Sequence, residues 1–125
     1  MYPEDLKYYK EHEWVRTEDD TAIVGISDYA QDSLGDIVYL ELPEEGTQVK
    51  AGETFGEVES VKSVSQLFSP VTGEVVEVNT ELVNQPEMIN SYPYERGWMI
   101  KVRLTDPGEL NRLMSAEEYE RFVQQ

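Results

Sequence analysis

The chain has 125 residues and a mass of 14.4 kDa, which is enough for one hydrophobic core and hardly for two. Apolar residues make up 39% and charged residues 29%, a balance typical of a globular protein. Because 26 acidic residues face 10 basic ones, the net charge is −16, which repels phosphate backbones and anionic lipid surfaces. We therefore expect neither a nucleic acid nor a membrane as partner, and one domain over residues 1–125.

Seven segments predict β-strands. Each is rich in β-branched or aromatic residues and is bounded by residues typical of turns. In chain order they cover residues 13–17, 21–26, 36–42, 54–60, 63–68, 73–79 and 98–104. In the sixth, strict alternation would place Val75 and Glu77 on one face and Val76 and Val78 on the other. The predicted fold class is mainly β.

Two helical segments interrupt this pattern. Residues 27–34 predict a short helix after the second strand, because the serine at its start can cap the first amides and Gly35 can end it. The C-terminal segment 106–124 is also predicted to be helical, and Ser115 and Glu118 have the spacing of a capping box. An apolar stripe, expected to lie on the sheet, follows at Tyr119, Phe122 and Val123.

A short motif is repeated along the chain. Residues 35–38, Gly-Asp-Ile-Val, are similar to residues 73–76, Gly-Glu-Val-Val. If the repeat reflects two like halves, the hairpin of residues 54–68 lies near their junction. Its tip is predicted at residues 61–62.

Groups for catalysis are scarce. The absence of cysteine excludes a thiolate nucleophile, a disulfide and a cysteine-ligated metal. His12 is the one histidine, and we interpret it as structural. Metal-ligand spacing and phosphate-binding glycine loops are missing too. We expect a protein that is not an enzyme, with no catalytic residues and no metal. The N-terminal sequence lacks targeting features, so we expect a bacterial cytoplasmic location. We also expect a monomer.

Lys62 is the residue with a distinctive setting. It stands at the predicted hairpin tip between small hydroxyl residues, and we expect its side chain to project from the sheet, free of neighbours. An isolated lysine in such a place is usually a solubilising charge. The functional alternative is attachment of a swinging cofactor, because an exposed amine without competing amines nearby suits acylation.

The sequence resembles the glycine cleavage H-protein family over almost its whole length. The matching segments occur in the family's order and cover residues 10–15, 25–31, 34–38, 41–43, 57–63, 69–75, 97–102 and 113–119. The resemblance implies a β-sandwich of the lipoyl/biotinyl-carrier type, also called a barrel-sandwich hybrid, with lipoate attached covalently to Lys62. It also implies that lipoate-attaching enzymes read the hairpin residues around the lysine, which are Glu59, Ser60, Val61 and Ser63.

The resemblance further implies a shuttle between enzymes. The lipoyl arm would take an aminomethyl group from a pyridoxal-phosphate-dependent glycine decarboxylase to an aminomethyltransferase that uses tetrahydrofolate. A dihydrolipoamide dehydrogenase would then reoxidise the dithiol. We expect the loaded arm to be held in a surface cleft, with Glu13 binding its cationic amine. At position 66 the chain has Gln66 where the family frequently has an acid.

Other interpretations remain open. A biotin carrier usually has methionine on both sides of its lysine, whereas Val61 and Ser63 flank Lys62 here. Lipoyl modules of the 2-oxoacid dehydrogenases usually have aspartate before the lysine and continue into further domains. A lipoyl donor in cofactor relay would use the same residues. An unmodified acidic interaction domain is the alternative from a different class.

Overall fold

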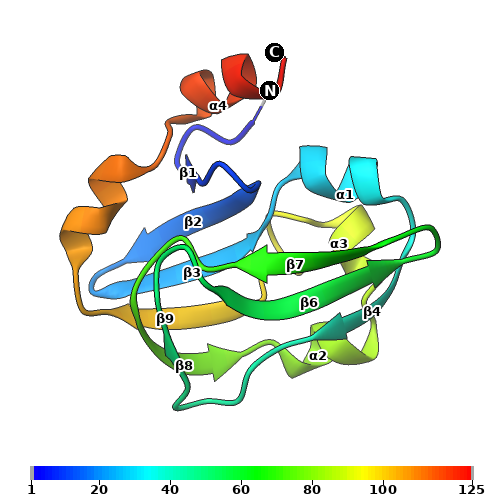
Figure 1. The fold of residues 1–125 in the computed structure, drawn as a ribbon, viewed down its shortest axis with the longest axis horizontal. Helices are drawn as coiled ribbons and strands as arrows, with labels where there is room; N and C mark the ends of the chain where they lie inside the picture. Colours follow the sequence, from blue (N-terminus) through cyan, green and yellow to red (C-terminus); the bar gives the residue numbers. More distant parts are fainter. Residues whose placement is uncertain (1, 125) are drawn as a thin grey trace.

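Two antiparallel sheets form a β-sandwich in the computed structural model, which describes residues 2–124 (Figure 1). The strands are β1 (Lys7–Tyr8), β2 (Glu13–Glu18), β3 (Thr21–Ile26), β4 (Ile37–Glu41), β5 (Gln48–Val49), β6 (Thr54–Ser60), β7 (Val64–Phe68), β8 (Gly73–Val78) and β9 (Ile100–Leu104). The six-stranded sheet has the order β1-β2-β3-β9-β8-β5, and the three-stranded sheet has the order β4-β6-β7. The predicted class, mainly β with two facing sheets, is confirmed.

The helices are short. They are α1 (Asp28–Leu34), α2 (Thr80–Asn84), α3 (Met88–Ser91), the 3-10 helix η1 (Pro107–Arg112) and α4 (Ala116–Val123). Helix α1 begins as predicted, because Ser27 Oγ accepts the amide of Ala30 at 3.2 Å, and it ends at Gly35, whose φ of +82° favours glycine. Helices α2 and α3 and the two-residue strands β1 and β5 were not predicted from the sequence. No helix in residues 2–124 is long and apolar enough to cross a membrane.

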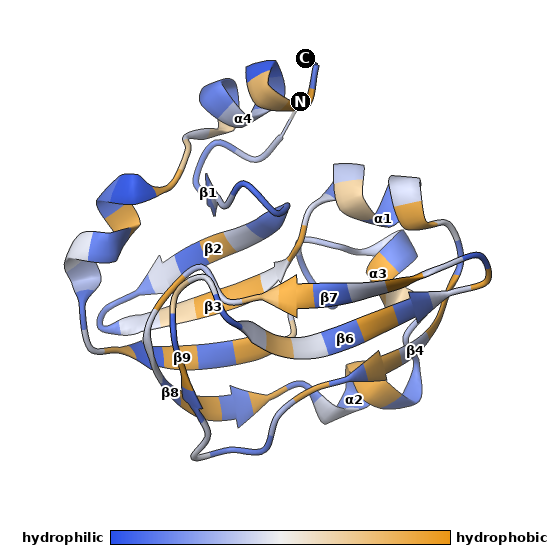
Figure 2. Ribbon diagram, viewed as in Figure 1, coloured by the Kyte–Doolittle hydropathy of each residue, from blue (hydrophilic) through white to orange (hydrophobic). Residues whose placement is uncertain are grey.

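The core lies between the two sheets. Apolar and polar residues alternate along β9, so this strand turns one face inward (Figure 2). The six-stranded sheet contributes Val15, Ala22, Val24, Ile26, Val75, Ile100 and Val102, and the three-stranded sheet contributes Ile37, Leu40, Phe55, Val58 and Leu67. The three-stranded sheet, which ends in the β6–β7 hairpin, is therefore packed on a continuous apolar layer.

Strand β8 departs from strict alternation. Val75 pairs with Val102 and Glu77 with the adjacent Lys101, so Val76 is the extra residue of a β-bulge. Val75 is buried, whereas Glu77 is exposed and lies 3.3 Å from the Lys101 ammonium. The prediction that Val75 and Glu77 share one face is wrong because the bulge rotates the strand between them.

The repeated four-residue motif precedes or opens strands in different sheets. Residues 35–38 lead into β4, and residues 73–76 begin β8. Gly35 has a positive φ at a helix end, whereas a Cβ on Gly73 would overlap the carbonyl oxygen of Arg103 in the neighbouring strand. The two glycines therefore meet different physical requirements.

The C-terminal segment is helical and contains two helices. Helix η1 begins at the cap Asp106, and α4 has the predicted capping box between Ser115 and Glu118. Tyr119 of α4 stacks on Tyr8 of β1, with ring centroids 4.6 Å apart, in a second apolar cluster beside the N-terminal segment (Figure 1). Phe122 is 37% exposed, so the predicted apolar stripe is only partly buried.

Candidate functional site

The tip of the β6–β7 hairpin presents Lys62 to solvent. Val61, Lys62 and Ser63 are all exposed, Val61 by 68%. The Ser60 amide donates to the Ser63 carbonyl oxygen at 2.8 Å, so these two serines face each other across the predicted tip residues 61–62. The tip lies beside the loop between α1 and β4 (Figure 1). The geometry leaves the lysine open to a large enzyme.

Ser60 determines the shape of this turn. Its side chain is buried, and its hydroxyl oxygen accepts the amides of Lys62 at 3.2 Å and Ser63 at 3.1 Å. The same hydroxyl donates to the Ser63 carbonyl oxygen at 3.3 Å. Within residues 2–124 only His12 and Asp19 are non-glycine residues with positive φ, so the turn avoids the primed geometry that needs glycine or asparagine. A side-chain acceptor therefore replaces the glycine that the sequence lacks.

The side chain of Lys62 lies close to Gly35. Its Cε lies 3.2 Å, and its Nζ 3.9 Å, from the position that a Cβ on Gly35 would take. The prediction of a lysine free of neighbours is therefore wrong, because its aliphatic part lies against the glycine at the end of α1. The ammonium nevertheless belongs to an exposed residue.

The remaining predicted hairpin residues differ in their exposure. Glu59 is half-buried and pairs with Val64 across the hairpin, and Ser63 is exposed. The structure brings together all four residues around Lys62. Only Ser60 among them is buried, and its hydroxyl bonds to the turn itself.

Glu13 lies below the surface at the start of β2. Glu13 is 1% exposed, and its Oε2 accepts a hydrogen bond from the amide of Phe68 at 3.0 Å. The other carboxyl oxygen, Oε1, is buried and has no hydrogen-bond partner. Such an orphaned acceptor is costly in a protein interior and has the capacity to bind an incoming donor.

Burial changes the acidity of this carboxyl. Removal from water raises the pKa of Glu13 to about 8, although the Phe68 amide opposes the rise by favouring the ionised form. Nearby Glu11 raises the pKa further. A cation placed at Oε1 would favour ionisation, so binding of an amine and loss of the proton are coupled.

Lys62 and Glu13 lie at opposite ends of β7. The strand runs from Val64, two residues after the lysine, to Phe68, whose amide contacts Glu13. Six residues of extended chain span roughly 20 Å. The two predicted site residues are therefore not in contact, and β7 lies between them.

Gln66 lies in the middle of β7. Its Nε2 donates to Glu57 Oε1 of β6 at 3.0 Å, and the two residues are cross-strand partners. An acid at position 66 would oppose Glu57 directly, and like charges in that arrangement are destabilising. The amide at position 66 removes this repulsion.

Two cavities have linings that include neither Glu13 nor Lys62. A cavity of about 310 Å³ near the Glu13 end is lined by Tyr9, Lys10, Ala51, Gly52, Pro70, Glu109, Arg112 and Leu113. It shares neighbours with Glu13, since the amide of Tyr9 donates to the Glu13 carbonyl oxygen and Pro70 follows Phe68 closely. Glu13 does not itself line it.

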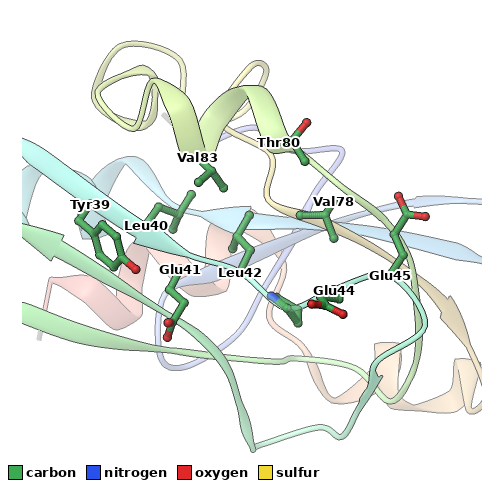
Figure 3. A pocket seen from close by; sticks show the side chains of 10 residues that line it. Tyr39, Leu40, Glu41, Leu42, Glu44, Glu45, Val78, Thr80 and Val83 are labelled. Carbon is green, nitrogen blue, oxygen red and sulfur yellow. The ribbon is translucent and has the colours of Figure 1, made fainter.

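The larger cavity, of about 580 Å³, lies between β4 and α2. Leu40 and Leu42 extend toward Val78 and Val83, and glutamates lie at its margin (Figure 3). Neither Lys62 nor Glu13 lines it. Its size therefore does not mark the site that the lysine defines.

Among residues 2–124 there is no group of three or more His, Asp or Glu side chains placed to hold a metal. His12 is half-buried, and its Nδ1 lies 2.7 Å from the Tyr119 hydroxyl, which also contacts Ser27 Oγ at 2.7 Å. Burial lowers the pKa of His12. These contacts join α4 to the body of the protein, consistent with the structural interpretation of His12.

Two facing sheets with an exposed lysine at a hairpin tip are the architecture of a lipoyl-carrier protein. The family model for "Glycine cleavage H-protein" matches residues 6–125. The chain is 55% identical over 124 residues to the glycine cleavage system H protein of Brevibacillus brevis, covering 99% of this chain and 98% of the relative. It is 54% identical over 121 residues to that of Staphylococcus carnosus, covering 97% and 96%.

A solved structure is also similar. The crystal structure of a glycine cleavage system H protein from Mycobacterium marinum has a TM-score of 0.91 and 42% sequence identity, covering 98% of this chain and 99% of that one. The chain belongs to the glycine cleavage H-protein family. The predicted family and fold type are thereby confirmed.

Proposed function

We propose that the protein is the lipoyl-bearing shuttle of a glycine cleavage system, with lipoate attached to Lys62. The observation that carries the proposal is the exposed Lys62 on a turn held by Ser60, in a chain of the H-protein family. The partners are the glycine decarboxylase, the aminomethyltransferase, the dihydrolipoamide dehydrogenase and a lipoate-attaching enzyme. We place the protein in the bacterial cytoplasm as a monomer, without catalytic groups of its own.

The residues around Lys62 fit a lipoyl group. The amine is accessible for amide formation, and Val61 and Val64 are 68% and 56% exposed, so apolar surface adjoins it. When bound, lipoate supplies a disulfide that can be reduced, bear a one-carbon unit and be re-formed. The protein contributes a rigid base from which a long arm can reach several active sites at high effective concentration.

Attachment requires a neutral amine at Lys62. The attaching enzyme joins the lipoate carboxyl group to the AMP part of ATP and releases pyrophosphate. The lysine nitrogen then attacks the activated carboxyl carbon, loses a proton and displaces AMP. Exposure of the tip leaves room for the enzyme's base and for the activated acid. Ser60 holds the amide of Lys62, so the enzyme receives a preformed turn and does not have to order it.

Glu13 supports a second role for the protein, which is to hold the loaded arm. An aminomethyl group carries a cationic amine, and Glu13 Oε1 is a buried acceptor without a partner. The Phe68 amide fixes the carboxyl group through Oε2 and leaves Oε1 available. Burial of the amine against this oxygen would exclude the water that releases the one-carbon unit.

Reconstitution with the three partner enzymes tests the shuttle. Lys62→Arg keeps the charge but cannot form the amide, so we expect glycine-dependent release of carbon dioxide to fall to background. Lys50→Arg is the matched control, because Lys50 is the nearest other lysine in the sequence. It should keep full activity, because the proposal attaches lipoate to Lys62 alone. Full activity of Lys62→Arg would overturn the proposal.

A separate experiment tests Glu13. The lifetime of the aminomethyl-loaded protein should shorten in Glu13→Gln, whereas lipoylation of Lys62 should proceed as in the wild type. Glu53→Gln, which changes an exposed acid in the same way, should leave the lifetime unchanged. Equal lifetimes for all three proteins would exclude this role for Glu13.

A further inference from the structure

Asn90 of α3 makes three hydrogen bonds to residues 31–37, a stretch that is distant from it in the sequence. Its Nδ2 donates to Gln31 Oε1 and to the Gly35 carbonyl oxygen, both at 2.9 Å. Its Oδ1 accepts the amide of Ile37 at 3.0 Å. Both amide hydrogens and one lone pair are therefore used to hold the connection between α1 and β4.

The turn that carries Lys62, residues 60–63, packs against this connection, residues 35–37. The carbonyl oxygen of Asp36 accepts the amide of Val61 at 3.0 Å, and Lys62 lies against Gly35. Asn90 bonds to the residues on both sides of Asp36. Displacement of residues 35–37 would therefore move both the acceptor of the Val61 amide and the surface that Lys62 touches.

Two separate sets of hydrogen bonds hold the turn. Ser60 fixes its internal shape through the amides of residues 62 and 63. The hydrogen bonds of Asn90 fix where the turn lies relative to the body of the protein. A modifying enzyme that reads a rigid tip requires both the shape and the position.

We propose that Asn90 is a positioning residue for the acylation of Lys62, acting through residues 35–37 without touching the enzyme or the lipoate. This inference rests on the proposed lipoylation of Lys62. If residues 35–37 become mobile, only a fraction of the molecules presents the lysine correctly. The apparent affinity for the enzyme is then multiplied by that fraction. KM therefore rises, whereas kcat for molecules already bound changes little.

Asn79 provides a matched control. Asn79 is buried, whereas Asn90 is half-buried, and the side-chain amide of Asn79 likewise makes three hydrogen bonds. They run to the carbonyl oxygens of Arg96 at 3.0 Å and Trp98 at 2.7 Å and from an amide of α2 at 3.4 Å. None of its partners belongs to residues 35–37 or 60–63. Asn79→Ala therefore loses similar bonds far from the lysine turn in the contact network.

The experiment measures lipoylation of full-length wild type, Asn90→Ala and Asn79→Ala by a lipoate–protein ligase with lipoate and ATP. Urea unfolding gives the folded fraction of each, by which the rates are corrected. We expect Asn90→Ala to raise KM by about tenfold, which corresponds to about one molecule in ten presenting the lysine correctly. Asn79→Ala should keep the wild-type KM.

A second variant and a second measurement keep the inference open to refutation if Asn90→Ala does not fold. Asn90→Asp keeps an acceptor for the Ile37 amide but loses the donor to the Gly35 carbonyl oxygen. It should raise KM too, and hydrogen exchange of the Val61 amide should quicken in it but not in Asn79→Ala. Equal KM values and exchange rates in all variants would overturn the positioning role while leaving lipoylation intact. A wild type that is not acylated at Lys62 would overturn both proposals.

Discussion

Replacement of Glu13 by glutamine tests the energetic effect of its burial. The folded protein keeps a proton on Glu13 up to a pKa of about 8, whereas the unfolded chain releases it near the ordinary value of 4.5. The folded state therefore binds more protons between these pH values, so the free energy of unfolding falls as pH rises through this window. One pKa unit corresponds to about 1.4 kcal/mol, and the full difference gives an upper bound of about 5 kcal/mol.

The assay is urea unfolding from pH 4.5 to pH 9. In wild type, stability should decline by up to about 1.4 kcal/mol per pH unit until about pH 8 and then level off. Glu13→Gln has no proton to release and should lose this slope. The exposed control Glu53→Gln should keep it. Parallel stability curves for wild type and Glu13→Gln would refute the conclusion that the buried carboxyl is held neutral.

Three further substitutions test separate contacts. Ser60→Ala removes the acceptor of two turn amides and should lower the free energy of unfolding by about 1–3 kcal/mol in urea; an unchanged midpoint would contradict this. Gly35→Ala combines a φ of +82° with a Cβ 3.2 Å from Lys62 Cε, so lipoylation should slow, and a wild-type rate would count against the contact. Tyr119→Phe removes a hydroxyl 2.7 Å from the buried Ser27 Oγ and should lower stability by about 1–3 kcal/mol; the same thermal midpoint as wild type would dismiss that bond.

Local signals predicted the regular elements well. The cap Ser27, the stop Gly35 and the capping box at Ser115 act within a few residues, so the sequence alone contains the whole interaction. The long strands likewise follow from side-chain type and turn residues. In contrast, α2 and α3 have five and four residues and show no helical periodicity; Asn79, which caps α2, was the available signal.

Features that depend on tertiary contacts could not be predicted. The bulge at Val76 leaves no mark in the run Val-Val-Glu-Val, because it depends on pairing with β9. The burial of Glu13 is concealed by a composition with 26 acidic residues, most of which suggest a solvated surface. The role of Asn90 depends on partners 53 to 59 residues away in the sequence.

Mass spectrometry of the protein isolated from its own organism shows whether Lys62 carries lipoate. We expect a lipoyl increment on the peptide that contains Lys62, and this increment should gain two hydrogens on reduction. A biotinyl increment at Lys62, or an unmodified lysine in cells that break down glycine, would contradict it.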